Sequence, residues 1–119
     1  MLLIKNANIY APSHLGNRDV IVGGGKIESI RDQVQNVDVF DEVVDLNGAI
    51  LTPGFIDQHV HVTGAGGKRG FSSMSPEIKI SELLACGTTT VVGLLGTDGT
   101  TRSIKSLYAK VKALDKDGI

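Results

Sequence analysis

The stretch Pro53-Gly54-Phe55-Ile56-Asp57-Gln58-His59-Val60-His61 marks a change in the pattern of the chain. Residues 55–62 are rich in apolar and β-branched side chains and predict a strand. Side chains two residues apart point to the same face of a strand, so His59 and His61 are expected to present two imidazoles side by side. Imidazole binds zinc and other late first-row divalent metals. We therefore predict that His59 and His61 bind one divalent metal ion.

A His-x-His pair alone is a weak signal, because two unrelated histidines can share a strand. Its position here, at the end of a strand and before a glycine-rich loop, favours metal binding, since catalytic groups of βα barrels lie at the carboxyl ends of strands. Asp57 falls on the same face and is a candidate third ligand. The alternative, which we favour, is a buried carboxylate that accepts backbone hydrogen bonds or orients a histidine.

Residues 1–52, upstream of this stretch, predict short strands joined by tight turns. Gly23-Gly24-Gly25 can supply the positive φ of a hairpin, and Asn47-Gly48 is a dipeptide favoured in type I′ turns. The strand candidates are residues 2–10, 19–22, 26–30, 37–46 and 49–52. Together they predict a small antiparallel β-module, resembling part of a β-sandwich, over residues 1–52.

Residues 53–119 instead predict an alternation of strand, helix, strand and helix. Ser75-Pro76-Glu77 has the features of a helix start, with Ser at the N-cap, and Gly87 would end that helix. Residues 88–95 form a near-continuous apolar run, as in strands buried on both faces of a parallel sheet. Thr100 or Thr101 would cap a second helix that ends at Gly118.

This alternation implies a parallel sheet with helices outside it. Two βα units cannot close a barrel, since a (β/α)₈ barrel takes roughly 250 residues. The predicted fold is therefore mixed α/β. An antiparallel β-module is followed, over residues 53–119, by the first two βα units of an incomplete (β/α)₈ metal-dependent hydrolase barrel.

Composition excludes several classes of function. The 119 residues carry 12 basic and 13 acidic side chains, a net charge of -1, and no Trp, which argues against nucleic acid and membrane surfaces as partners. No apolar run is long enough to span a bilayer. Cys86 is the single cysteine, so no internal disulfide forms. We expect a soluble, cytoplasmic protein.

Two further segments are candidates for ligand contact. Gly64-Ala65-Gly66-Gly67 either lets backbone amides approach a ligand closely or is a flexible connector. Thr97 follows the second barrel strand, again at the expected catalytic end. It either forms a hydrogen bond with substrate or belongs to an ordinary turn and helix cap.

At residues 53–61 the chain resembles the amidohydrolase superfamily, metal-dependent hydrolases whose barrel follows a small β-module. The likeness narrows to the isoaspartyl (β-aspartyl) dipeptidase family through Gly64-Ala65-Gly66-Gly67, Ser75-Pro76-Glu77, residues 87–98 and Ala113-Leu114. It covers essentially all 119 residues but only about the first third of such an enzyme.

The resemblance implies hydrolysis of small β-aspartyl dipeptides with two zinc ions (Zn²⁺, or another divalent metal) in the complete active site. His59 and His61 would bind the more buried zinc, and Gly66 and Thr97 would contact substrate. The remaining metal ligands, a bridging carboxylated lysine and the aspartate base would lie on later strands. No catalytic residue is therefore assigned within this chain.

One residue departs from the family pattern. Lys68 stands where that family usually has a glutamate, which is expected to pair with the α-ammonium of the substrate. Lysine would repel an ammonium group. Either the substrate preference differs, or the loop aligns one residue away, or the amine is held elsewhere.

Two competing hypotheses remain. The first is a cyclic-amide hydrolase of the dihydroorotase or hydantoinase type, which the same His-x-His pair supports. The second is that the 119-residue chain is catalytically inactive as it stands, because two histidines fall short of the three protein ligands of a typical catalytic zinc site. Open strand edges and apolar faces also predict self-association, as a homo-oligomer, or pairing with the missing segment of the barrel.

Overall fold

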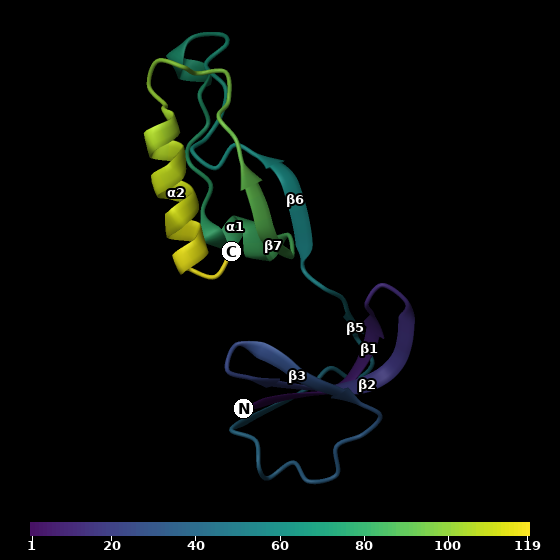
Figure 1. Cartoon of the computed structure of the whole chain (residues 1–119). Coiled ribbons are helices and arrows are strands. Elements are labelled where there is room, and N and C mark those ends of the chain that lie inside the picture. The colour runs from purple at the N-terminus through teal and green to yellow at the C-terminus, as the bar shows by residue number, and fades with distance from the viewer. The chain divides into compact units, whose positions relative to one another are not determined.

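The computed structural model describes all 119 residues, which divide into two compact units, Met1–Pro53 and Gly54–Ile119 (Figure 1). The division falls at Pro53-Gly54, where the sequence pattern changes. No helix in either unit is long and apolar enough to cross a membrane.

Unit Met1–Pro53 is a five-stranded sheet. Its strands, in chain order, are β1 (Leu2–Tyr10), β2 (His14–Gly23), β3 (Lys26–Arg31), β4 (Glu42–Asp45) and β5 (Ile50–Leu51). The sheet order is β3-β2-β1-β4, and β5 also pairs with β1. Gly24 and Gly25 adopt φ of +56° and +75° between β2 and β3, which confirms the predicted glycine hairpin.

The prediction of a purely antiparallel module was wrong. Strands β1, β2 and β3 are antiparallel, but β4 and β5 both run parallel to β1. The connection after β3 carries the chain back across the sheet, where the amides of Asp41 and Glu42 donate to the carbonyl of Met1. Only the last part of the predicted strand 37–46 therefore pairs, as β4.

Asn47-Gly48 forms a tight turn but not the predicted hairpin. Both residues have positive φ, 49° and 82°, and the amide of Ala49 donates to Leu46 O at 2.9 Å. The strands on either side of this turn do not pair with each other. Both pair with β1, which itself bulges at Asn6 (φ 52°). The turn thus places β4 and β5 one after the other along β1.

Strands β1 and β2 contribute an apolar core cluster to this unit. Ala7, Ile9 and Val20 are buried there, and four half-buried residues pack against them: Ile4, Val22, Leu46 and Leu51. Burial of alternate residues of β1 follows from the period of two in a strand.

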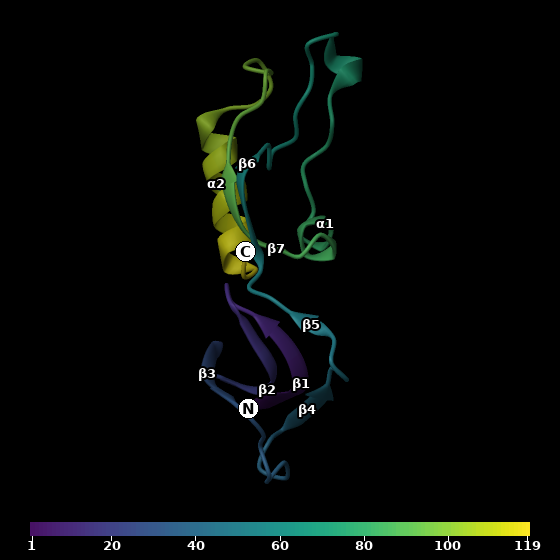
Figure 2. The same ribbon diagram turned by 90° about the vertical axis from the view of Figure 1, so that its right-hand side faces the viewer.

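Unit Gly54–Ile119 contains a two-stranded parallel sheet and two helices (Figures 1 and 2). The elements are β6 (Phe55–Val60), a 3₁₀ turn η1 (Phe71–Ser73), α1 (Ile80–Ala85), β7 (Thr88–Gly93) and α2 (Ile104–Lys116). The predicted order of strand, helix, strand and helix is confirmed. Both views show the chain between β6 and α1 as a long excursion beyond the strand ends, with η1 at its tip.

A small core joins these elements. Val62, Leu83 and Leu114 are buried together, and α2 approaches β7 closely at Gly93, where an added Cβ would lie 2.7 Å from Val111. Strand β7 was predicted to be buried on both faces, which is wrong for this chain. Val92 is 48% exposed, whereas its neighbour Val91, on the other face of the strand, packs against the core.

Both predicted helix starts lie too early. Helix α1 begins at Ile80, where the Glu82 carboxylate accepts the amide of Lys79 at 2.7 Å. Helix α2 is capped by Ser103, whose hydroxyl accepts the amide of Ser106 at 3.2 Å. The predicted ends are confirmed, since Gly87 and Gly118 follow the helices with φ of +70° and +98°.

Candidate metal and substrate site

His59 and His61 stand at the carboxyl end of β6. Their ring centroids are 5.1 Å apart, and the rings are almost perpendicular, at 85°. His59 is exposed and His61 is half-buried. The spacing of i and i+2 along the strand therefore brings the two imidazoles together, as the sequence predicts.

A backbone carbonyl faces one ring nitrogen of His61 and selects its tautomer. Its Nδ1 lies 3.2 Å from Leu94 O, just beyond β7. A carbonyl oxygen can only accept, so Nδ1 carries the proton, and in the neutral ring Nε2 keeps a free lone pair. Leu94 is itself held to β6, because its amide donates to Val60 O at 2.8 Å. The β6–β7 pairing thus orients His61 with Nε2 as the donor atom available to a metal.

Asp57 has a different environment from the one predicted. It is exposed rather than buried, and its Oδ1 accepts the amide of His59 at 3.0 Å. The expected backbone hydrogen bond is present. No group of three or more His, Cys, Asp or Glu side chains in the structure is arranged to hold a metal. The Asp57 carboxylate is thus engaged by the backbone of His59.

A hollow of about 350 Å³ opens beside the histidines. Asp57, His59 and His61 line one side of it. The segment that precedes α1 and that helix line the other side, with Ser75, Pro76, Glu77, Ile78 and Glu82. Two imidazoles and three carboxylates therefore surround this space.

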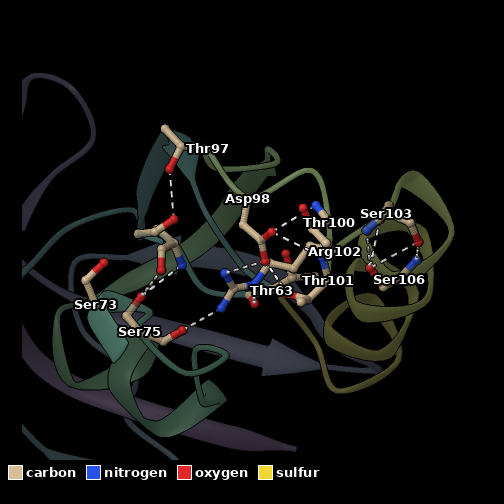
Figure 3. A network of polar contacts seen from close by, with 12 residues as sticks. Thr63, Ser73, Ser75, Thr97, Asp98, Thr100, Thr101, Arg102, Ser103 and Ser106 are labelled. Atoms are coloured by element: carbon tan, nitrogen blue, oxygen red, sulfur yellow. Dashed lines mark hydrogen bonds and ion pairs between the residues drawn. The ribbon is translucent and has the colours of Figure 1, made fainter. Parts of the chain in front are cut away.

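Gly66 and Thr97 are in direct contact. The Thr97 hydroxyl donates to Gly66 O at 2.8 Å, across 31 residues of sequence (Figure 3). The loop after β6 is thereby joined to the loop after β7. The two residues predicted to contact substrate lie together at the carboxyl ends of the strands.

The glycine run packs closely against the segment that leads to α1. An added Cβ would lie 2.3 Å from Ser75 O at Gly64 and 2.3 Å from Ser73 O at Gly66. Ser75, the predicted helix cap, binds this loop instead: its hydroxyl accepts the amide of Ala65 at 2.8 Å. At Gly64 and Gly66 glycine is required for this close approach of backbone to backbone.

A polar network around Asp98 and Arg102 was not predicted from the sequence (Figure 3). Asp98 accepts the amides of Thr100 and Thr101 at 2.9 and 3.1 Å, as well as the Thr101 hydroxyl. The hydrogen bond from the Thr101 side chain, aided by the two amides and by Arg102, lowers the pKa of Asp98. These bonds explain why Thr100 and Thr101 do not cap α2.

Arg102 joins three segments of this unit. Its Nε donates to Thr63 O at 2.6 Å, its Nη2 donates to Ser75 O at 2.7 Å, and its Nη1 lies 3.6 Å from Asp98 Oδ2. An Asp-Gly-Thr-Thr turn pattern could have indicated Asp98. No local pattern indicates Arg102, whose carbonyl partners are 27 and 39 residues away.

Comparison with known proteins gives three informative relatives, although no protein-family model matches the sequence. The β-aspartyl dipeptidase of Fervidobacterium islandicum AW-1, solved in complex with the dipeptide β-Asp-Leu, is 47% identical with a TM-score of 0.87, and the match covers 99% of this chain. The chain is similar to the N-terminal portion of an amidohydrolase. It spans 31% of that dipeptidase chain.

Other amidohydrolase relatives are more distant. The dihydroorotase of Lactobacillus johnsonii is 33% identical over 94 residues, which are 78% of this chain and 20% of that protein. The D-hydantoinase of Thermus sp. is 26% identical with a TM-score of 0.63, over 95% of this chain and 24% of that one. All three relatives are hydrolases, and the strand-rich unit and the unit that carries His59 and His61 both fall within the match to the dipeptidase.

Proposed function

We propose that this chain is the N-terminal part of a zinc-dependent amidohydrolase that hydrolyses β-aspartyl dipeptides. The observation that carries the proposal is the 47% identity over 99% of the chain to an enzyme whose structure holds β-Asp-Leu. In this proposal residues 1–52 belong to a β-sandwich-like module. Residues 53–119 form the first two βα units of a TIM-like barrel.

We propose His59 and His61 as metal ligands, and their environment fits that role. Neutral imidazole is a good zinc donor, and His61 has the arrangement typical of metal-binding histidines, in which the second ring nitrogen donates to a fixed carbonyl. A divalent metal bound there would lower the pKa of a bound water and polarise the scissile carbonyl. The backbone bond from His59 to Asp57 limits movement of the first ligand.

Gly66 and Thr97 are the proposed substrate contacts. The Thr97 hydroxyl uses its proton on Gly66 O, so toward a substrate it offers its remaining lone pairs as an acceptor. An acceptor at this point suits a substrate ammonium group. Lys68, exposed on the same loop, brings a positive charge that would oppose it.

The alternative function is a cyclic-amide hydrolase. The dihydroorotase of Lactobacillus johnsonii, 33% identical over 78% of the chain, supports it, and Lys68 is compatible with a substrate that lacks an ammonium group. The dipeptidase is the better supported function, because its identity to this chain, 47%, is higher than that of the dihydroorotase, 33%.

We further propose that the 119-residue chain alone is inactive. The chain offers two histidine ligands, and no third His, Cys, Asp or Glu side chain is arranged with them to hold a metal. A catalytic zinc site needs about three protein ligands. Turnover of β-Asp-Leu by pure 119-residue chain would refute this.

The complete protein is proposed to be a cytoplasmic homo-oligomer with small dipeptides as its ligands. Phe55 and Ile56 of β6 are 63% and 66% exposed, and adjacent apolar side chains of this kind are usually covered in the finished fold. Light scattering of the full-length protein would measure its oligomeric state, and a monomer would exclude this part of the proposal.

The function is tested by side-by-side kinetics of the full-length protein on β-Asp-Leu, hydantoin and dihydroorotate. We expect a kcat/KM for β-Asp-Leu at least about 100-fold above the other two, a difference of about 2.7 kcal/mol in transition-state binding. Preference for a cyclic amide would replace the dipeptidase proposal with the alternative.

A further inference from the structure

We propose that Arg102 is a positioning residue, which holds Gly66 and Thr97 in place by tying together the segments that follow β6 and β7. The inference rests on the proposed function, because Gly66 and Thr97 contact substrate only if that function holds. Arg102 itself touches neither the proposed metal ligands nor either proposed substrate residue through its hydrogen bonds.

The guanidinium group is suited to this task by burial and by shape. The Arg102 side chain is only 10% exposed, and that of Asp98 only 4%. Arginine stays protonated at any physiological pH, and its planar fork can donate to acceptors in several directions at once. Here the acceptors are Thr63 O, two residues after His61, and Ser75 O, at the far end of the loop.

The first link runs from Arg102 through Ser75 to Gly66. Two polar groups of Ser75 bind Ala65. The Ser75 amide donates to Ala65 O, and the Ser75 hydroxyl accepts the Ala65 amide, both at 2.8 Å. A Cβ at Gly64 would lie 2.3 Å from Ser75 O and 2.6 Å from Arg102 Nη2. The glycine loop therefore packs against Ser75 O, the carbonyl that accepts a hydrogen bond from Arg102.

The second link runs from Arg102 through Asp98 to Thr97. The Asp98 carboxylate, adjacent in sequence to Thr97, faces Nη1 at 3.6 Å. Nη1 and the hydroxyl of Thr63 are the buried side-chain polar atoms without a hydrogen-bond partner in this structure. The ion pair with Arg102 therefore restrains the residue next to Thr97. Arg102 thus acts on both partners of the Thr97–Gly66 hydrogen bond.

The test compares Arg102→Lys and Arg102→Met in the full-length, zinc-loaded protein. Lysine keeps the charge but not the planar fork of donors, and methionine keeps only an unbranched apolar stem. The matched control is Lys112→Gln, which removes a charge from the neighbouring helix α2, in an exposed ion pair with Asp115. For each variant, kcat and KM on β-Asp-Leu, zinc content, and deuterium exchange of residues 64–67, 73–76 and 88–93 are measured.

We expect KM to rise at least about tenfold in Arg102→Met and less in Arg102→Lys, with a smaller change in kcat. Zinc content should stay at the wild-type value, because His61 is oriented through Leu94 and not through Arg102. Exchange at residues 64–67 and 73–76 should accelerate at least about tenfold, while exchange of β7 stays unchanged. The control variant should match the wild type in every measurement.

Two results would overturn the inference. One is exchange that rises equally through residues 54–119, which would make Arg102 a general stabiliser of the unit. The other is unchanged exchange at the loop in both variants. If the wild-type protein fails to hydrolyse β-Asp-Leu, the proposed function fails by itself, and the exchange pattern still decides whether Arg102 holds the two loops together.

Discussion

Replacing Gly66 by alanine should destabilise unit Gly54–Ile119 by two separable effects. The first is conformational: Gly66 has φ +88°, and an L-residue in left-handed backbone costs about 1–2 kcal/mol. The second is steric, since the new Cβ would lie 2.3 Å from Ser73 O, whereas ordinary contact begins at 3.4 Å. The backbone must move, which puts about 1–2 kcal/mol of hydrogen bonding between Ala65 and Ser75 at risk. The total expected loss is about 3 kcal/mol.

Two other glycines separate these effects. Gly70 has φ +93° and ψ 170°, a backbone region that is essentially reserved for glycine, and an added Cβ there would meet no other atom within 4 Å, so Gly70→Ala should cost only a conformational part, about 1–3 kcal/mol. Gly99 has neither positive φ nor a close neighbour, so Gly99→Ala should be neutral or stabilising by up to about 1 kcal/mol. The three variants should therefore rank Gly66, Gly70, Gly99 in order of decreasing loss.

Urea unfolding followed by far-ultraviolet circular dichroism measures these differences, because α1 and α2 both belong to this unit. Equal m-values across the variants would show that the differences are in stability. Gly66→Ala equal in stability to Gly70→Ala would refute the close packing of the loop against Ser73. Gly99→Ala as damaging as Gly66→Ala would refute the argument for both effects.

Three further predictions follow from the same geometry. His59→Ala and His61→Ala in the full-length protein should each lower the bound zinc, measured by atomic absorption, and should each lower turnover by at least about 100-fold. Unchanged zinc content and unchanged turnover would remove that residue from the metal site. The pKa of Asp98 is lowered in the folded protein, so its ionised form contributes stability that is present above its unfolded pKa and lost as pH falls through the folded pKa. Asp98→Asn should lack this contribution, so the free energies of unfolding of the two proteins, measured against pH, should converge at low pH. Parallel curves of unfolding free energy would contradict the assignment. Leu114→Ala, at a side chain 3% exposed, should cost about 2–4 kcal/mol in urea unfolding, and a loss below about 1 kcal/mol would place Leu114 outside the core.

Local patterns predicted the elements of this fold well where local forces form them. The strand at residues 2–10 and the glycine turn between β2 and β3 depend on neighbouring residues alone, and both are confirmed. Strand direction in the first unit depends instead on where the connection between β3 and β4 returns the chain. The parallel pairing of β4 with β1 has no local signature, so the antiparallel prediction failed there.

The two misplaced helix starts have one physical cause. Ser75 and Thr101 are good N-cap residues by type, but each hydrogen-bonds elsewhere: Ser75 to Ala65, ten residues away, and Thr101 to Asp98. A capping residue is available to a helix only if no stronger partner takes its hydroxyl or its amide first. The helices therefore begin at the next position where a side chain can satisfy the first amides, after Lys79 and at Ser103.

The same division between local and distant forces runs through the candidate site. The histidine pair could be predicted, because parity along one strand places both rings, and Leu94 then orients His61 through the pairing of β6 with β7. The hydrogen bond between Thr97 and Gly66 joins two loops, which in our proposal Arg102 holds together. No sequence pattern indicates this role of Arg102. Metal binding should consequently be insensitive to changes in the loops, whereas substrate affinity should depend on them. Separate responses of zinc content and KM to one set of variants would establish that the two halves of the site are held by different parts of the fold.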